Sequence, residues 1–133
     1  MAALDTACPS MDSLKEKRVL VVGIGMLGLL AVEAALRAGA AVTATDPNSH
    51  RRRYAAQLGA CISGFSDFDP ALDIVENFDV ALEFSGSPQG VITCLKPLDI
   101  NGVAVLAGSV ADSPAIDLPR MDCPRLAHCY RRV

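Results

Sequence analysis

A glycine turn behind an apolar run constrains this sequence more than any other feature. Residues 19–28 read VLVVGIGMLG, in which a β-branched stretch leads directly into three glycines at the spacing GxGxxG. The stretch is too short and too uniformly apolar for an amphipathic helix, and it suits a strand buried on both faces. These ten residues alone allow three interpretations: a strand entering a phosphate-binding turn, the start of a membrane span, or a core segment that contains glycine.

Length argues against the membrane span. The apolar stretch that starts at Val19 meets Glu33 after 14 residues, whereas a span needs about 18–20 residues with few charges. No basic start followed by an apolar run stands at the N-terminus, so no signal peptide is expected. We therefore predict a cytoplasmic protein whose five cysteines, none in a CxxC pair, are reduced thiols.

The net charge predicts that neither nucleic acid nor an acidic membrane is a partner. The chain carries −3 at neutral pH, and binding to polyanions requires a basic field instead. The three arginines at 51–53 are too few to reverse this balance. At 133 residues, 51% of them hydrophobic, the chain is long enough for one domain with its own core.

Strand and helix patterns alternate along the chain. Strands are predicted at residues 19–22, 41–45, 61–63, 79–84 and 103–108, the last entered through a turn at 101–102. Helices are predicted at residues 26–38, 50–58 and 89–95. Gly39 and Gly59 end the first two helices, and Asn48 or Ser49 caps the second. This order predicts an α/β fold, a Rossmann-type doubly wound parallel sheet of five or six strands in a single domain.

The context of the glycine turn favours the phosphate-binding interpretation. A strand precedes the turn, a helix follows it, and an acid closes the next strand. Gly23 then permits the tight turn, Gly25 lets a pyrophosphate approach the backbone, and Gly28 lets the helix pack closely on the sheet. The amides of Met26 and Leu27, at the start of the helix, face the phosphates with the helix dipole behind them. The alternative is a strand–helix corner that binds nothing.

The acid is Asp46, which lies 18 residues past Gly28. At this spacing its carboxylate is expected to accept both ribose hydroxyls of an adenosine. The same carboxylate repels a 2′-phosphate, which favours NAD over NADP. Arg51, Arg52 and Arg53 work against this preference, because an arginine near the ribose could neutralise such a phosphate, and Arg51 is the candidate cofactor contact. The alternative is that two of the three arginines face solvent on a helix. The alternative is that Asp46 and Pro47 only open a turn.

Between residues 17 and 110 the sequence resembles a known family. From KRVLVVGIGMLGLLAVEAALRAGAAVTATDPNSHRRRYAAQLGA through DVALEFSG to GVAVLAGSV, it is similar to the nucleotide-binding domain of zinc-type medium-chain alcohol dehydrogenases. The branch it resembles most is the phosphonate-catabolism-associated alcohol dehydrogenases, and VALEFSG and VLAGSV are the most specific phrases. The resemblance implies an NAD-dependent oxidoreductase that acts on CH–OH groups.

Two strand-end turns border the nicotinamide half of the cofactor in that family. The resemblance carries this role to Ser85 and Gly86 in the first turn and to Ala107, Gly108 and Ser109 in the second. The carboxyl ends of parallel strands form the ligand crevice of such sheets, which agrees with this assignment. The alternative for residues 85–88 is a plain strand-ending turn.

The resemblance divides the chain into three parts. Residues 1–17 are a helix-and-loop remnant, 18–110 are the dinucleotide-binding domain, and 111–133 are a poorly specified tail. Residues 64–77 are polar and acidic, with at most a short helix. Full-length members of the family also carry an N-terminal domain that holds the catalytic zinc, which this sequence is expected to lack.

No residue is assigned as a metal ligand or as a catalytic group. Cys8 stands only 15 residues before Gly23, which is too close for the family's last zinc-ligating cysteine. Cys123, His128 and Cys129 fall within seven residues and make a poor tetrahedral set. Zinc is therefore expected only in full-length relatives.

The resemblance implies an NAD(H)-binding domain of a zinc-type alcohol dehydrogenase without its catalytic domain. Its small alcohol or carbonyl substrate belongs to the full-length family, and the isolated chain is expected to be inactive. It would be a truncated product or one part of a two-chain enzyme. A homodimer is expected through an edge strand within residues 126–133. Cys61 and Cys94 are expected to be core thiols.

Two other classes of protein combine a glycine turn with a strand-end acid. One is a regulatory nucleotide sensor, such as the cytoplasmic domains of potassium channels, which typically show Gly-Asp-Ala after the third strand where this chain has GACIS. The other is an adenosylmethionine-dependent methyltransferase, which rarely shows the full GxGxxG between such apolar segments. Fold alone does not separate the three classes.

Overall fold

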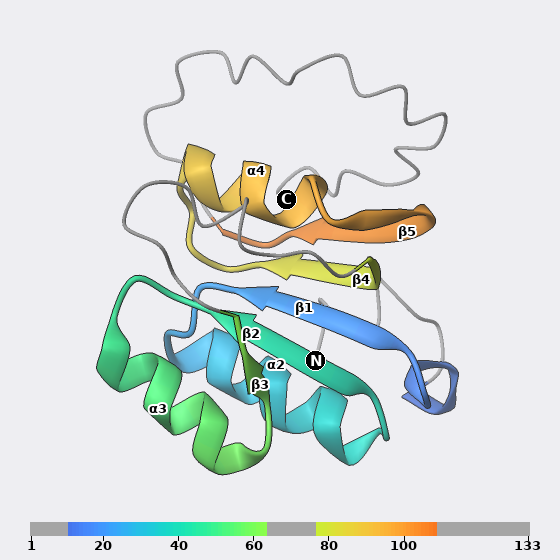
Figure 1. Cartoon of the computed structure of the whole chain (residues 1–133), viewed down its shortest axis with the longest axis horizontal. Coiled ribbons are helices and arrows are strands. Elements are labelled where there is room, and N and C mark those ends of the chain that lie inside the picture. The colour runs from blue at the N-terminus through green and yellow to red at the C-terminus, as the bar shows by residue number, and fades with distance from the viewer. Residues whose placement is uncertain (1–10, 64–76, 109–133) are drawn as a thin grey trace.

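A computed structural model of the chain describes residues 11–63 and 77–108. Within these ranges five strands form one sheet in the order β3-β2-β1-β4-β5, and all neighbouring strands are parallel (Figure 1). The strands are β1 (Arg18–Val22), β2 (Ala41–Thr45), β3 (Cys61–Ile62), β4 (Phe78–Glu83) and β5 (Leu98–Leu106). The predicted Rossmann-type parallel sheet is confirmed.

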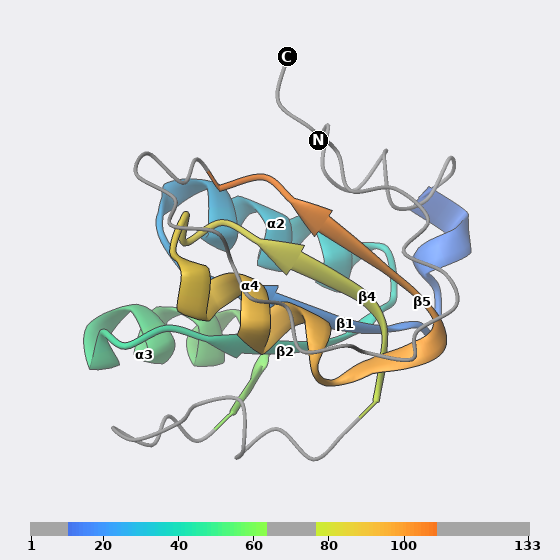
Figure 2. The same ribbon diagram turned by 90° about the horizontal axis from the view of Figure 1, so that it is seen from above.

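Helices cover both faces of the sheet (Figures 1 and 2). They are α2 (Met26–Arg37), α3 (Ser49–Leu58) and α4 (Pro88–Leu95), and a short 3₁₀ helix, η1 (Met11–Leu14), precedes β1. Alternate residues of β1 point to opposite faces. Val19 and Val21 pack in one core cluster with α2 and α3, whereas Leu20 and Val22 pack in another with Cys94 of α4.

Helix ends follow the local sequence signals. Asn48 caps α3, because its side chain accepts hydrogen bonds from the amides of His50 and Arg51, which decides between the two caps that the sequence left open. Gly59 ends the same helix at φ +109°, in the left-handed region that glycine occupies without strain. Ser87 caps α4, so that helix starts one residue earlier than predicted, at Pro88.

The predicted turn at 101–102 is wrong. β5 already begins at Leu98 and runs through both residues, with an irregularity in its pairing to β4 between Phe78 and Val80. Gly102 is needed inside this strand because a Cβ there would lie 2.9 Å from the carbonyl oxygen of Phe78. Leu98 and Val103 are the paired residues on either side, so Asn101 and Gly102 lie in an irregularity of the strand and have no partner on β4.

The two cysteines within the described ranges differ in burial. Cys94 is buried, as predicted; burial and then the charge of Glu83 raise the pKa of its thiol well above the usual value. The prediction that Cys61 is a core thiol is wrong, because it is exposed. It lies in a two-residue strand at the edge of the sheet, where β2 is the only strand it pairs with among the described ones. None of the helices in these ranges has the length and apolarity to cross a membrane.

At the amino edge of the sheet, Arg18 joins two aspartates. Its backbone amide donates to Oδ2 of Asp79 at 2.8 Å, and its guanidinium donates to Oδ1 of Asp79 and to Oδ2 of Asp99, both at 3.2 Å. The hydrogen bond from the guanidinium is the main reason why the pKa of Asp79 lies below its ordinary value. The ends of β1, β4 and β5 are held together here.

Acid is expected to destabilise the chain partly through Asp79. Since the folded chain lowers this pKa, the stabilisation is fully present above the ordinary value of 3.8 and is lost as the pH falls through the folded value. Asp79→Asn should therefore show a shallower fall in the free energy of unfolding between about pH 5 and about pH 2. Urea unfolding across that range measures it, and equal slopes for both proteins would contradict the expectation.

Candidate functional site

The turns that follow β1 and β4 meet at the carboxyl edge of the sheet. The strand order reverses at β1, because the chain proceeds outward to β2 and β3 and then returns to β4 on the other side. Open parallel sheets bind ligands in the crevice at such a point. Gly23 has φ +89°, and a Cβ on it would lie 2.6 Å from the amide nitrogen of Ser85. A glycine is therefore required where the two turns touch.

The other two motif glycines face different surroundings. A Cβ on Gly28 would lie 3.0 Å from the carbonyl carbon of Gly23 and closer still to its oxygen, so α2 packs on the turn only because Gly28 has no side chain. A Cβ on Gly25 would meet no atom within 4 Å. Packing within the described residues thus explains Gly23 and Gly28 but leaves Gly25 unexplained.

The N-terminus of α2 has no side-chain cap. Asn48 and Ser87 cap α3 and α4, whereas Gly25, at the same position of α2, offers no side chain to its first amides. Met26 and Leu27 occupy the first turn and are 79% and 61% exposed. Unpaired amides and the positive end of the helix dipole make such a terminus attractive to anions.

Asp46 is folded back onto the glycine turn. Its Oδ2 accepts from the amide of Ile24 and its Oδ1 from the amide of Asn48, both at 2.8 Å, and only 4% of the residue is exposed. A carboxylate has about four acceptor positions, so each oxygen retains capacity for a further donor. The carboxylate therefore holds the turn and retains acceptor positions for a ligand.

Two arginines of α3 contact different groups at the end of β2. Arg51 places Nη1 3.6 Å from Oδ2 of Asp46 and is exposed. Arg52 reaches back to the end of β2 and donates to the carbonyl oxygens of Asp46 and Pro47, at 2.7 and 2.9 Å. Arg51 is thus the arginine that neighbours the Asp46 carboxylate.

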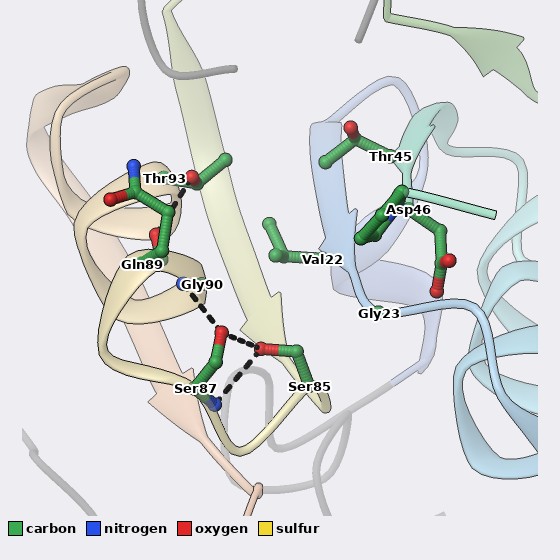
Figure 3. A pocket seen from close by; sticks show the side chains of 10 residues that line it. Val22, Gly23, Thr45, Asp46, Ser85, Ser87, Gln89, Gly90 and Thr93 are labelled. Atoms are coloured by element: carbon green, nitrogen blue, oxygen red, sulfur yellow. Dashed lines mark hydrogen bonds between the residues drawn. The ribbon is translucent and has the colours of Figure 1, made fainter. Parts of the chain in front are cut away.

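A cavity of about 100 Å³ opens between the ends of β1 and β2 and helix α4 (Figure 3). Gly23, Asp46 and Ser85, which the sequence singled out separately, all line it. Seven further residues, none of them among the predicted cofactor-binding residues, complete the lining: Val22, Thr45, Pro47, Ser87, Gln89, Gly90 and Thr93. Thr45 is 2% exposed and its hydroxyl has no hydrogen-bond partner within the described ranges.

Glu83 is the main residue of the site that the sequence analysis missed. It ends β4, is completely buried, and its Oε1 accepts from the amides of Ser85 and Gly86 at 2.6 and 3.0 Å. An acid that follows the apolar residues 80–82 and stands directly before Ser-Gly-Ser was the available signal, because buried carboxylates are rare without partners.

The turn after β5 approaches the turn after β4. The amides of Ala107 and Gly108 both donate to the carbonyl oxygen of Glu83 at 2.9 Å. A Cβ on Gly108 would lie 2.7 Å from the Cα of Gly86, so the two predicted turns are in direct contact. Ser109, the remaining predicted site residue, lies outside the described residues.

No metal site emerges from residues 11–63 and 77–108, where His, Cys, Asp and Glu form no group of three that could bind an ion. Cys8, Cys123, His128 and Cys129 lie outside these ranges, as does the edge strand predicted within 126–133.

The sequence of the chain matches a known protein family over most of its length. The family profile described as zinc-binding dehydrogenase matches residues 27–131. The chain belongs to the zinc-binding dehydrogenase family. The resemblance inferred from the sequence is therefore confirmed, while its phosphonate-catabolism branch stays a prediction. The match favours neither the nucleotide sensor nor the methyltransferase.

Individual members of the zinc-binding dehydrogenase family agree with this assignment. L-threonine 3-dehydrogenase of Legionella pneumophila is 33% identical over 106 residues, covering 74% of this chain and 31% of the relative. The crystal structure of L-idonate 5-dehydrogenase from Escherichia coli superposes with TM-score 0.68 at 30% identity, over 90% of this chain and 35% of that one. Acetophenone reductase of Geotrichum candidum, in complex with NAD, gives TM-score 0.63 at 28% identity, over 71% and 27%. The chain thus spans about a third of the length of these relatives.

Proposed function

We propose that this chain binds NAD(H) and forms the cofactor-binding part of a dehydrogenase that interconverts an alcohol and a carbonyl compound. The observation that carries the proposal is the uncapped N-terminus of α2 beside Gly25, whose missing side chain leaves open space. A pyrophosphate placed there would receive the first amides of α2 and the positive end of its dipole. The similarity to acetophenone reductase, whose structure was determined in complex with NAD, supports a dinucleotide as the ligand.

The adenosine end of the cofactor is proposed to enter the cavity beside Asp46. The free acceptor positions of that carboxylate suit ribose hydroxyls, and the unpartnered hydroxyl of Thr45 offers a further polar group. Pro47 and Val22 supply apolar contact for a flat base. Ser85 lines the same cavity, which favours a position nearer the adenosine than the sequence predicted.

The nicotinamide end is proposed to lie toward the turns that follow β4 and β5. When bound, the nicotinamide ring would supply the hydride acceptor or donor. Gly86, Ala107 and Gly108 would orient it through backbone atoms, since two of the three have no side chain; Ser109 is proposed to extend this wall. Met26 and Leu27, exposed at the start of α2, would shield the cofactor from water on the other side.

The proposal also covers the substrate, the location and self-association of the chain. The substrate is proposed to be a small alcohol or carbonyl compound, because the similar proteins are dehydrogenases of L-threonine and L-idonate. A cytoplasmic location accords with the free thiols of Cys61 and Cys94. Self-association is proposed at β5, which ends the described sheet and carries Ile100 at 71% exposure.

Isothermal titration of the 133-residue chain tests the proposal. NADH, NADPH, adenosylmethionine and ATP are titrated separately, because the latter two report the alternatives that share a glycine turn. Binding of NADH in preference to the last two supports a dehydrogenase cofactor site. Tighter binding of adenosylmethionine or ATP than of either dinucleotide would refute it.

We expect the chain to bind NADH more tightly than NADPH. The Asp46 carboxylate would face the 2′-phosphate of NADPH, and Asp46→Asn removes this repulsion while keeping one oxygen acceptor for the turn. The variant should narrow the ratio of the two dissociation constants by about tenfold, which corresponds to about 1.4 kcal/mol. Arg51→Gln provides the matched test of the neighbouring charge and should weaken NADPH more than NADH. A preference of the unmodified chain for NADPH would contradict the assignment of Asp46.

A further inference from the structure

Glu83 is a buried carboxylate that forms no salt bridge with any residue in the described ranges. It is 0% exposed, and its Oε1 accepts from the amides of Ser85 and Gly86 and from the hydroxyl of Ser85. Taking a carboxylate out of water is costly unless hydrogen bonds compensate. Here all the compensating donors belong to one loop, the one that joins β4 to α4.

The hydrogen bonds continue from this loop into α4 (Figure 3). The Ser85 hydroxyl donates its one proton to Glu83, so the 3.0 Å contact between the hydroxyls of Ser85 and Ser87 must use the proton of Ser87. The Ser87 oxygen in turn accepts from the amide of Gly90 at 3.0 Å and caps α4. A single chain of contacts therefore runs from the end of β4 to the first turn of α4.

This chain of contacts leaves the Ser85 hydroxyl no capacity for a ligand. It donates to Glu83 and accepts from both the amide and the hydroxyl of Ser87, which uses its proton and both lone pairs. Ser85 and Ser87 nevertheless line the cavity. Their hydroxyls consequently shape the wall of the cavity and hold it in place.

The Glu83 carboxylate leaves no room for a side chain at two neighbouring glycines, Gly90 and Gly108. A Cβ on Gly90 would lie 2.7 Å from Oε1, and a Cβ on Gly108 would lie 2.5 Å from Oε2. The backbone oxygen of Glu83 also accepts from the amides of Ala107 and Gly108. Oε2 has no hydrogen-bond partner within the described ranges. One residue therefore contacts the turn after β4, the start of α4 and the turn after β5.

We propose that Glu83 is a positioning residue for the cofactor, which sets the β4–α4 loop and the first turn of α4 as one wall of the dinucleotide cavity. The inference rests on the proposed function for its ligand. An apolar side chain of similar volume is often no less stable than a buried charge. The carboxylate is therefore explained by the loop geometry that it imposes, which an apolar side chain cannot reproduce.

Two substitutions at Glu83 separate the hydrogen-bond acceptor from the space that it fills. Glu83→Met keeps the length of an unbranched side chain and removes both oxygens. Glu83→Gln keeps one oxygen in place for the amides of Ser85 and Gly86. Val91→Ala is the control, because Val91 is buried on α4 and packs against Leu95, away from the cavity lining.

Two measurements are made on each protein: the dissociation constant for NADH and amide hydrogen exchange in the ligand-free chain. Glu83→Met should raise the dissociation constant about tenfold or more and speed exchange at Ser85 and Gly86, since both amides lose their acceptor. Glu83→Gln should restore binding to within about threefold of the unmodified chain. Val91→Ala should lower the melting temperature without changing the dissociation constant.

Unchanged NADH binding by a folded Glu83→Met protein would overturn the inference, and so would an equal loss of binding in Val91→Ala. If Glu83→Met does not fold, Ser85→Ala carries the test, because it removes the hydroxyl link alone. Weaker binding by about threefold then supports the inference, and unchanged binding overturns it. Failure of the unmodified chain to bind NADH would refute the proposed function and the cofactor role together, while hydrogen exchange still decides whether Glu83 holds the loop.

Discussion

Gly25→Val is expected to weaken NADH binding at least about 100-fold, which corresponds to about 2.7 kcal/mol. A branched side chain at this position would occupy the space proposed for the pyrophosphate, in front of the uncapped amides of α2. The fold should survive, because a Cβ at Gly25 meets no atom within 4 Å and its φ of −78° suits any residue. Valine is a poorer N-cap than glycine, so a loss of up to about 1 kcal/mol in stability is expected.

Titration calorimetry and circular dichroism of the same sample check this expectation. Ala41→Val is the matched control: it adds a β-branched side chain at an exposed position of β2, at the opposite edge of the sheet. The control should bind NADH as the unmodified chain does. Wild-type affinity in Gly25→Val would show that the glycine turn is only a strand–helix corner.

Gly28→Ala is expected to act on stability and not chiefly on binding, because a single added methyl group should strongly lower the free energy of unfolding. Within a helix this change normally stabilises by about 1 kcal/mol. Here the new Cβ would overlap the carbonyl of Gly23, a backbone group that cannot rotate away, so α2 must move off the turn. We expect the free energy of unfolding to fall by about 3 kcal/mol.

Urea unfolding measures this loss, with Gly25→Ala as the comparison within the same motif. Because that Cβ enters open space, Gly25→Ala should cost no more than about 1 kcal/mol, the difference between the two residues as N-caps. If both variants are equally stable, the close contact between α2 and the β1 turn does not constrain the helix. Together the two glycines separate the binding role of the motif from its packing role.

Local sequence signals accounted for most of the fold. The β-branched run of β1 and the glycines after α2 and α3 predicted strand and helix ends to within a residue, because each depends on groups near in sequence. The start of β5 was wrong for the complementary reason. Leu98 enters the strand because it pairs with Phe78, which no local signal shows, whereas Asn101 and Gly102 have no partner on β4 and interrupt the regular pairing.

The residues of the candidate site likewise fall into those that local sequence signals predicted and those that depend on tertiary structure. The glycine motif and Asp46 were recognisable because their spacing along the chain defines a strand, a turn and a second strand end. Glu83 was missed although its neighbours were selected, since its position before Ser-Gly-Ser hints at a role but its burial depends on elements distant in sequence. Likewise, neither Cys61 nor Cys94 carries a local signal of its burial, and only their places at the sheet edge and on the buried face of α4 separate them.

The sequence by itself determined the order of elements, the place of the glycine turn and the family, because periodicity, glycine spacing and short motifs are properties of neighbouring residues. Tertiary structure alone decided which of these residues share one cavity. Asp46 and Ser85 are far apart in the sequence. They line the same cavity only because the strand order places β2 and β4 on either side of β1. The burial of Glu83 has the same origin: a carboxylate can be enclosed only where the turns after β4 and β5 and the start of α4 close around it.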